Sequence, residues 1–143
     1  MFTRSASTHR LEGLPLFAAC SADELDVIDS SLTQVRLEAG QVLTREGHYG
    51  RQFLIVVDGQ LAVTRSSQGE RPVAILGAGD VAGEMALLEG TPRTATVTAI
   101  TPATVYVANP REFAVLMSVP SVASAIRDTA GRRHEANEAS RAA

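Results

Sequence analysis

The sequence contains little of what would indicate a metal site or a disulfide. Tryptophan is absent, aromatic residues make up only 4% of the 143 residues, and there is one cysteine, Cys20. A lone cysteine cannot form an intrachain disulfide, and we interpret Cys20 as a small hydrophobe of the core. The three histidines, His9, His48 and His134, lie too far apart in the sequence to suggest a metal cluster. We therefore predict no metal, and a core built mainly from valine, leucine, isoleucine and alanine.

Long apolar runs and a strong net charge are missing as well. No stretch approaches the roughly 20 apolar residues of a transmembrane helix, and no secretory signal begins the chain. The formal net charge of −3 argues against the broad basic face that nucleic acids require. With 45% apolar and 20% charged residues, the composition is typical of a globular domain. We predict a single cytoplasmic domain with no membrane span and no nucleic-acid partner.

The beginning of the chain combines a polar segment with a helical pattern. Residues 1–10 are polar, and we expect them to be flexible. Ser21 and Glu24 then fit a capping box, in which each side chain accepts a hydrogen bond from the other residue's backbone. The apolar residues that follow, from Leu25 to Leu32, recur on one helical face. This segment predicts an N-terminal helix.

The end of the chain carries a second helical pattern. Asn109 is a favourable N-cap, Pro110 suits the first helical position, and Glu112 suits the first turn. The apolar stripe that follows ends at Ala130, just before a glycine. Residues 131–143 have no apolar face, so we expect a polar tail that frays or is held from outside the core.

Between the two helical regions the pattern changes to short β-branched runs. From about residue 35 these runs are separated by glycines at 40, 47, 50, 59, 69, 77 and 79. The spacing predicts about eight strands of an antiparallel sandwich or barrel, interrupted once by a short helix. The predicted fold class is mainly β: an antiparallel β-roll (double-stranded jelly-roll) with flanking helices, forming one domain over residues 11–130.

The interruption, GEMALLEGTPRTATV at residues 83–97, holds the candidate chemistry. Residues 84–89 are good helix formers, and Gly83 permits a tight turn before them. The start of such a helix leaves backbone N–H groups free to bind an anion. Two helical turns followed by a proline return the chain to its starting point, so Arg93 can face the same small volume as Glu84.

These residue types together favour a nucleotide. Arginine and free amides suit a phosphate, while a carboxylate suits a neighbouring sugar hydroxyl. Thr94 adds a hydroxyl, but strand alternation lets Arg93 and Thr94 reach one ligand only if Arg93 lies at a loop–strand junction. The alternative interpretation is that Glu84 and Arg93 form a surface ion pair, which contributes little to stability.

The same segment resembles the phosphate-binding cassette of cyclic nucleotide-binding domains, the family of the catabolite activator and the protein kinase A regulatory subunit. The family pattern is Gly-Glu, a small apolar helix, and then Pro-Arg-Ala/Thr/Ser-Ala-Ser/Thr-Val. The matching positions are Gly83, Glu84, Ala86, Leu87, Leu88, Pro92, Arg93, Thr94, Ala95, Thr96 and Val97. Residues 14–17, with the helix that follows Ser21, resemble the family's entry helix, and residues 39–47, 57–59 and 76–80 resemble landmarks of its β-roll. Ala82 departs from the bulky aromatic that is frequent there, and we expect looser packing behind the cassette.

The resemblance implies a role for each matching residue. Glu84 would receive the ribose 2′-hydroxyl, and Arg93 would pair with the exocyclic oxygens of the cyclic phosphate. Backbone groups at Gly83, Met85 and Ala86 would line the ribose-phosphate, and Thr94 would contact phosphate or base. Pro92 and Ala95 complete the predicted ligand-binding set. The ligand would be cAMP in preference to cGMP, although a threonine at position 94 also occurs in members that prefer cGMP.

The resemblance also implies a lid formed by the C-terminal helices, which would shift over the bound ligand. Arg132, Arg133 and His134 lie just beyond the apolar stripe, where one of them could stack on the purine or donate a hydrogen bond to it. The alternative is that they form a solvated helix end. We predict a non-catalytic sensor that needs no cofactor and acts through an effector protein or a homodimer.

Two other interpretations compete with this one. A metal-dependent enzyme or sugar-binding protein of the similar cupin roll would need histidines at metal-ligand spacing, which the sequence does not supply. A vestigial member of the family would keep the roll and serve as a dimerisation or protein-interaction module. The complete set of polar cassette residues argues against the vestigial interpretation, whereas Ala82 leaves it open.

Overall fold

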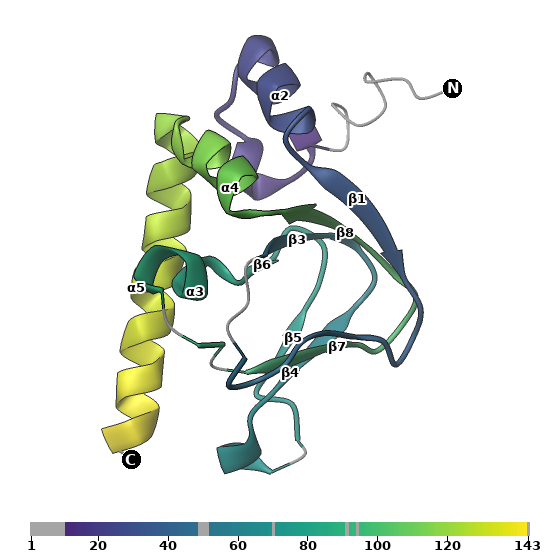
Figure 1. Ribbon diagram of the computed structural model, residues 1–143, viewed down its shortest axis with the longest axis vertical. Coiled ribbons are helices and arrows are strands. Elements are labelled where there is room, and N and C mark those ends of the chain that lie inside the picture. Colours follow the sequence, from purple (N-terminus) through teal and green to yellow (C-terminus); the bar gives the residue numbers. More distant parts are fainter. Residues whose placement is uncertain (1–10, 49–51, 70, 91, 94, 143) are drawn as a thin grey trace.

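Two four-stranded antiparallel sheets form the body of the protein. The computed structural model describes residues 11–142 except 49–51, 70, 91 and 94, and at 68, 85, 86 and 133–142 it describes the backbone alone. The sheets have the strand orders β1-β8-β3-β6 and β2-β7-β4-β5 and face one another (Figure 1). The strands are β1 (Thr33–Leu37), β2 (Val42–Thr44), β3 (Phe53–Asp58), β4 (Leu61–Thr64), β5 (Ala74–Leu76), β6 (Val81–Ala82), β7 (Thr96–Ala99) and β8 (Ala103–Ala108). The predicted mainly β fold, an antiparallel roll with flanking helices, is confirmed.

The central strands of the first sheet, β3 and β8, are largely buried on both faces because they lie between the second sheet and the helices. Along β3, Phe53 and Ile55 belong to one apolar cluster, which also contains residues of the helices. The alternate residues Leu54 and Val56 belong to the other cluster, between the sheets. Successive strand residues point to opposite faces, so a continuous apolar run is what a strand in this position requires. The Phe53 and Phe113 rings, with centroids 5.1 Å apart, join β3 to the helical layer.

The two predicted capping boxes are both present. The helix α2 (Ala22–Asp29) has Ser21 as its N-cap, and Ser21 and Glu24 exchange the expected hydrogen bonds of 2.8 and 3.2 Å. The helix α4 (Pro110–Met117) begins in the same way, with bonds of 2.8 and 2.9 Å between Asn109 and Glu112. Before α2, a short 3-10 helix, η1 (Pro15–Phe17), packs against the C-terminal helix. These local signals determine where the helices begin.

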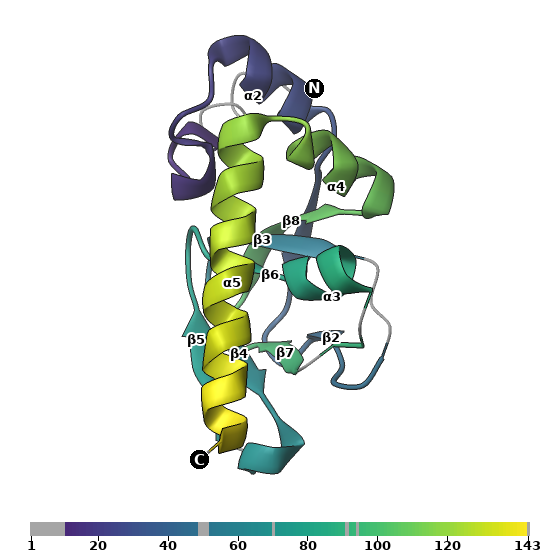
Figure 2. The same cartoon turned by 90° about the vertical axis from the view of Figure 1, so that its left-hand side faces the viewer.

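The C-terminal helix extends beyond the apolar stripe. The stripe ends at Ala130, after which we expected a polar tail that frays or is held from outside the core, and α5 (Pro120–Ala142) continues through Gly131 without a break. A helical glycine costs only about 1 kcal/mol relative to alanine, and the alanine, glutamate and arginine residues after it are good helix formers. Helix α5 runs along one side of the roll (Figures 1 and 2).

The short helix between the last strands is where the sequence places it. Helix α3 (Glu84–Glu89) follows β6 and lies beside α5, which it contacts (Figure 2). Among the described residues, no helix combines the length and the apolar character that crossing a membrane would need. The segment that carries the candidate chemistry thus starts at the edge strand of the first sheet and continues against α5.

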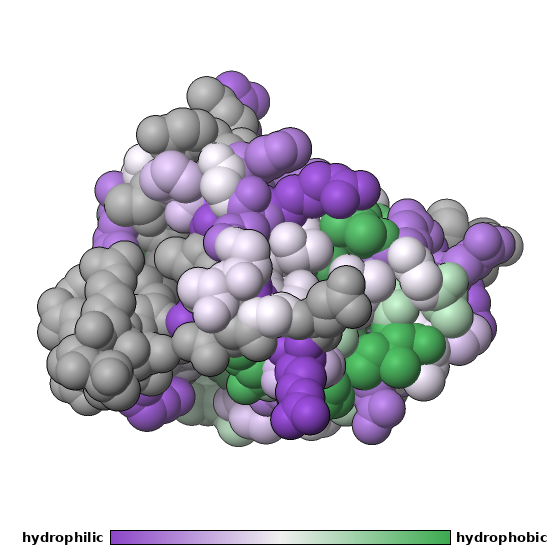
Figure 3. Space-filling model, turned by 90° about the horizontal axis from the view of Figure 1, so that it is seen from below, coloured by the Kyte–Doolittle hydropathy of each residue, from purple (hydrophilic) through white to green (hydrophobic). Residues whose placement is uncertain are grey.

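Apolar side chains reach the surface in several places. Seen from below, apolar areas are separated by more hydrophilic side chains (Figure 3). The large apolar residues that are more than a third exposed are Val27, Val73, Ile75, Leu88 and Ile100. They come from α2, the β5 region, α3 and the end of β7. This scattered distribution does not favour one particular partner, so an effector protein or a homodimer stays a prediction.

Candidate ligand-binding site

The candidate site lies where β6 turns into α3. Gly83 occupies this turn with φ of +92°, in the left-handed region that favours glycine. A Cβ atom at this position would collide with the guanidinium of Arg93 and with the carbonyl oxygen of Gln52. Glycine is therefore required twice, by the backbone conformation and by the close approach of Arg93. Glu84 follows as the first residue of α3 and is only 1% exposed.

Arg93 enters this site from the other side and is only 6% exposed. Its backbone is held by residues 47 and 48: the Arg93 N–H donates to the His48 carbonyl (2.8 Å), and the Gly47 N–H donates to the Arg93 carbonyl (2.9 Å). At the far end of the side chain, Nη2 donates to the Gln52 carbonyl. Both ends of Arg93 are thus bonded to the connection between β2 and β3.

The guanidinium still has unused donors. Nε and Nη1 of Arg93 are buried and have no hydrogen-bond partner among the described residues. Burial lowers the pKa of Arg93, and the negative charge of Glu84 opposes this effect. Arginine nevertheless stays charged in proteins. The site therefore holds a buried cation that is partly balanced by a carboxylate and incompletely hydrogen-bonded.

This geometry decides between the two interpretations of the pair. The negative charge of Glu84 lies close enough to Arg93 to raise the pKa of its guanidinium. Both residues are almost completely buried. The alternative of a surface ion pair is therefore wrong, because it requires solvent around both groups.

The other predicted ligand-binding residues have different surroundings. Arg93 lies in the loop three residues before β7, which begins at Thr96. Ala95 is buried, whereas Pro92 is exposed. The backbones of Met85 and Ala86 form the first turn of α3, but their side chains lie outside the described part of the structure. Thr94 lies outside the described residues altogether, so its contact with a ligand stays a prediction.

The residues predicted to cover the ligand belong to α5. Arg132 is exposed, and its Nη2 donates to Thr129 Oγ1 at 3.3 Å, within the same helix. Arg133 and His134 continue the helix, but their side chains are outside the described residues. Ala82 is buried and pairs with Leu54 at the edge of the first sheet. Helix α5 contacts α3, so the predicted lid and the cassette are adjacent elements.

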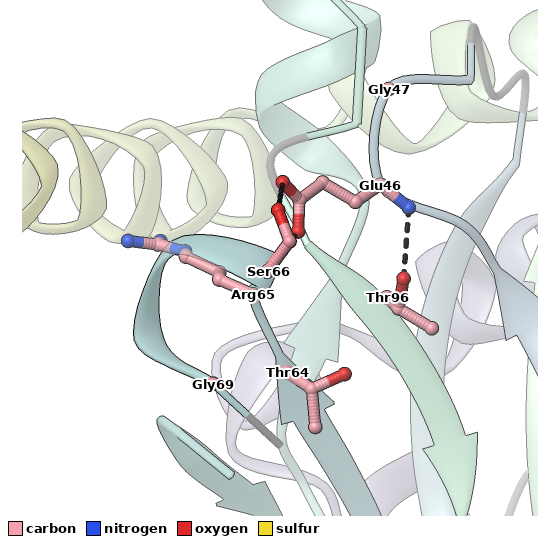
Figure 4. A pocket seen from close by; sticks show the side chains of 7 residues that line it. All are labelled: Glu46, Gly47, Thr64, Arg65, Ser66, Gly69 and Thr96. Carbon is pink, nitrogen blue, oxygen red and sulfur yellow. Dashed lines mark hydrogen bonds between the residues drawn. The ribbon is translucent and has the colours of Figure 1, made fainter. Parts of the chain in front are cut away.

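Sequence reasoning missed the part of the site supplied by the connection between β2 and β3. Gly47, His48 and Gln52 act through their backbone groups, and no side-chain pattern identifies a backbone donor or acceptor. It also missed a pocket of about 480 Å³ beside this connection, lined by Glu46, Gly47, Thr64, Arg65, Ser66, Gly69 and Thr96 (Figure 4). Within the described residues, no three His, Cys, Asp or Glu side chains gather as a metal site would require.

Comparison with known proteins identifies relatives of this chain. The family model described as "Cyclic nucleotide-binding domain" matches residues 34–119. A cyclic nucleotide-gated potassium channel of Rhizobium etli is 37% identical over 121 residues, which are 84% of this chain and 33% of the channel. The chain thus spans about a third of the length of this relative.

Two solved structures support the same assignment. The regulatory domain of Toxoplasma gondii PKA, solved with cAMP, has a TM-score of 0.78 and 28% identity, covering 90% of this chain and 50% of that one. A cAMP-binding acyltransferase from Mycobacterium smegmatis has a TM-score of 0.71 and 28% identity, covering 93% of this chain and 42% of that one. With the family match extending over more than half of its length, the chain belongs to the cyclic nucleotide-binding domain family.

Proposed function

We propose that the domain binds cAMP in preference to cGMP, between Glu84 and Arg93. The observation that carries the proposal is the buried guanidinium of Arg93, whose Nε and Nη1 have no hydrogen-bond partner among the described residues. Buried polar groups are costly when they are left unpaired. A cyclic phosphodiester would complete this group, because it supplies one negative charge and two exocyclic oxygens as acceptors.

Glu84 is assigned to the ribose. A carboxylate repels a phosphate but accepts a hydrogen bond from a neighbouring sugar hydroxyl, a charge-assisted contact worth about 1.5–3 kcal/mol. The negative charge of Glu84 in turn favours the charged form of the Arg93 guanidinium, because it opposes the lowering of the Arg93 pKa by burial. Backbone groups of Gly83, Met85 and Ala86 would line the ribose-phosphate between them.

The preference for cAMP is supported by the solved relatives. The T. gondii regulatory domain was solved with cAMP, and the M. smegmatis acyltransferase is described as cAMP-binding. Thr94 remains the residue that would favour cGMP, by contacting the guanine amino group. We retain Thr94, Pro92 and Ala95 as proposed ligand contacts beside the Glu84–Arg93 pair.

Signalling is proposed to run from α3 to α5. Glu84 is the first residue of α3, and α3 contacts α5. A ligand that draws α3 toward Arg93 would change that contact, and it would shift α5 only if its affinity differs between the two arrangements. Arg132, Arg133 and His134 are then proposed base contacts from the displaced helix. The domain itself is proposed to be regulatory and non-catalytic, acting on an effector protein or as a homodimer.

Calorimetric titration with cAMP and, separately, cGMP tests this proposal. We expect the wild type to bind cAMP more tightly than cGMP. Arg93→Ala should weaken cAMP binding by about 100-fold or more, since it removes charged hydrogen bonds of about 1.5–3 kcal/mol each.

Arg71→Ala is the matched control, because it removes the same charge from an exposed position outside the site. It should leave the affinity unchanged. Negligible heats for both nucleotides with the wild type would reject the proposal and favour the vestigial interpretation. Equal losses in the Arg71 and Arg93 variants would mean that general electrostatics, and not a phosphate contact, dominates binding.

A further inference from the structure

The pocket beside the β2–β3 connection contains a hydrogen-bonded clamp that the sequence analysis did not assign. The Glu46 carboxylate accepts two hydrogen bonds from Ser66, one from its backbone N–H to Oε1 (2.8 Å) and one from its hydroxyl to Oε2 (2.9 Å). The backbone N–H of Glu46 donates to Thr96 Oγ1 at 3.0 Å. Figure 4 shows the carboxylate turned toward Ser66 and the backbone N–H turned toward Thr96. Glu46 is thus bonded to two separate segments.

The clamp lies on the outer face of the second sheet. Thr96 is opposite Thr64 in the pairing of β7 with β4, so both side chains point to the same face. The adjacent residue Val97 belongs to the cluster between the sheets, which places Thr96 on the opposite side. The clamp is therefore separate from the buried site of Glu84 and Arg93.

The backbone connects the clamp to that site directly. Gly47, the next residue after Glu46, donates its N–H to the Arg93 carbonyl, and His48 accepts the Arg93 N–H. Residues 46–48 are therefore bonded to Ser66 on one side and to the Arg93 peptide on the other. The two bonds from Ser66 to the Glu46 carboxylate thus fasten this short turn to the β4–β5 connection.

We propose that Glu46 is a positioning residue for nucleotide binding: by clamping Ser66 it fixes residues 46–48, and these fix the Arg93 peptide from which the phosphate-binding guanidinium extends. This inference rests on the proposed function of Arg93 and adds to it a residue that would never touch the ligand. Displacing the Arg93 peptide by a fraction of an ångström would misalign its donors, to which charged hydrogen bonds are sensitive.

The test compares two substitutions of Glu46, and it repeats one of them in a protein that already carries Arg93→Lys. Glu46→Ala removes the clamp, whereas Glu46→Gln keeps an amide oxygen that can accept from Ser66. Titration with cAMP should show a loss of about tenfold for Glu46→Ala, comparable to one weakened charged hydrogen bond, and a loss of less than about threefold for Glu46→Gln. In an Arg93→Lys background, Glu46→Ala should have almost no further effect, because the lysine lacks the planar set of donors whose alignment matters.

A measurement without ligand separates this inference from the proposed function. Amide hydrogen exchange of the free domain should accelerate at Gly47 and Arg93 in Glu46→Ala and remain slow in Glu46→Gln. Glu38→Ala is the matched control: Glu38 is an exposed glutamate of the turn before β2, and it bonds to Gln41 through its backbone N–H and carbonyl. It should change neither exchange nor affinity.

Each outcome assigns the failure to one proposal. If the wild type binds neither cAMP nor cGMP, both proposals are overturned. If it binds cAMP while Glu46→Ala retains full affinity, or loses the same factor in the Arg93→Lys background, only the positioning role is overturned. A loss in Glu46→Gln as large as in Glu46→Ala would also overturn it, because the charge of Glu46 and not its hydrogen bonds would then be responsible. Thermal unfolding of every variant verifies that the compared proteins are folded.

Discussion

Replacing Gly83 by alanine should lower both the free energy of unfolding and the affinity for the nucleotide, and the two losses can be measured separately. The backbone at Gly83 has φ of +92°, where a non-glycine residue costs about 1–2 kcal/mol. The added Cβ would also collide with the Arg93 guanidinium and the Gln52 carbonyl, and the carbonyl belongs to the backbone. The Arg93 guanidinium must move away from the added methyl group, and the collision with the carbonyl can be relieved only by a shift of the backbone. We therefore expect a stability loss above the 1–2 kcal/mol of backbone strain, and a loss of nucleotide affinity.

Gly40→Ala is the control that isolates the collision. Gly40 has nearly the same backbone conformation, with φ of +89°, but a Cβ there would meet no atom within 4 Å. It should lose about 1–2 kcal/mol of unfolding free energy, which corresponds to a melting temperature lowered by roughly 3–8 °C for a domain of this size, and it should bind cAMP normally.

Denaturant unfolding and calorimetric titration of the two variants provide the comparison. The difference in unfolding free energy between Gly83→Ala and Gly40→Ala measures the collision alone. If the two variants lost the same stability and Gly83→Ala bound cAMP like the wild type, the close packing of Arg93 on Gly83 would be refuted. The assignment of Arg93 to the phosphate would then lose its geometric basis.

Three further predictions concern local features. Ser21→Ala and Asn109→Ala should each cost about 1 kcal/mol of unfolding free energy, because each removes the N-cap of a capping box, as denaturant unfolding would reveal. Gly131→Ala should raise the melting temperature, since it replaces glycine inside α5 where a Cβ meets no atom within 4 Å, a gain of about 0.5–1 kcal/mol; a decrease would contradict the continuous helix. The hydrogen bonds from Ser66 lower the pKa of Glu46, with a smaller contribution from the nearby charge of Arg65. This stabilisation is complete above the ordinary glutamate pKa of about 4.3 and is lost as the pH falls through the lower pKa of the folded state, so unfolding of Glu46→Gln should depend less on pH in this range.

The features that sequence reasoning identified are those set by neighbouring residues. The capping boxes of Ser21 and Asn109 involve residues three positions apart, and the short helix from Glu84 depends on its own composition and on Gly83. The strands follow from alternation and glycine spacing, and the resemblance of the cassette indicated which residues would converge. Such local signals do not depend on the rest of the fold.

The features that it missed depend on contacts between distant segments. The hydrogen bonds of Arg93 to His48 and Gln52 join residues more than 40 positions apart through backbone carbonyls. Ser66 reaches Glu46 across 20 positions by its backbone and hydroxyl, which no spacing rule predicts. The continuation of α5 beyond the apolar stripe has a local cause instead: the residues around Gly131 favour helix strongly enough to outweigh one glycine.

The way Arg93 is held has a consequence for affinity. An arginine side chain carries about 2 kcal/mol of rotamer entropy, which a ligand must normally offset when it orders the side chain. Here the peptide is fixed by residues 47 and 48, and the guanidinium is bonded to Gln52 before any ligand is present. Most of this entropy is therefore lost when the domain folds and not when the ligand binds, which strengthens ligand affinity by roughly 30-fold relative to a mobile arginine. The unused donors at Nε and Nη1 add a desolvation cost to the free domain that an anion would relieve. Both terms lower the stability of the free domain relative to the complex, so saturating cAMP should raise the melting temperature of the wild type and leave that of Arg93→Ala nearly unchanged.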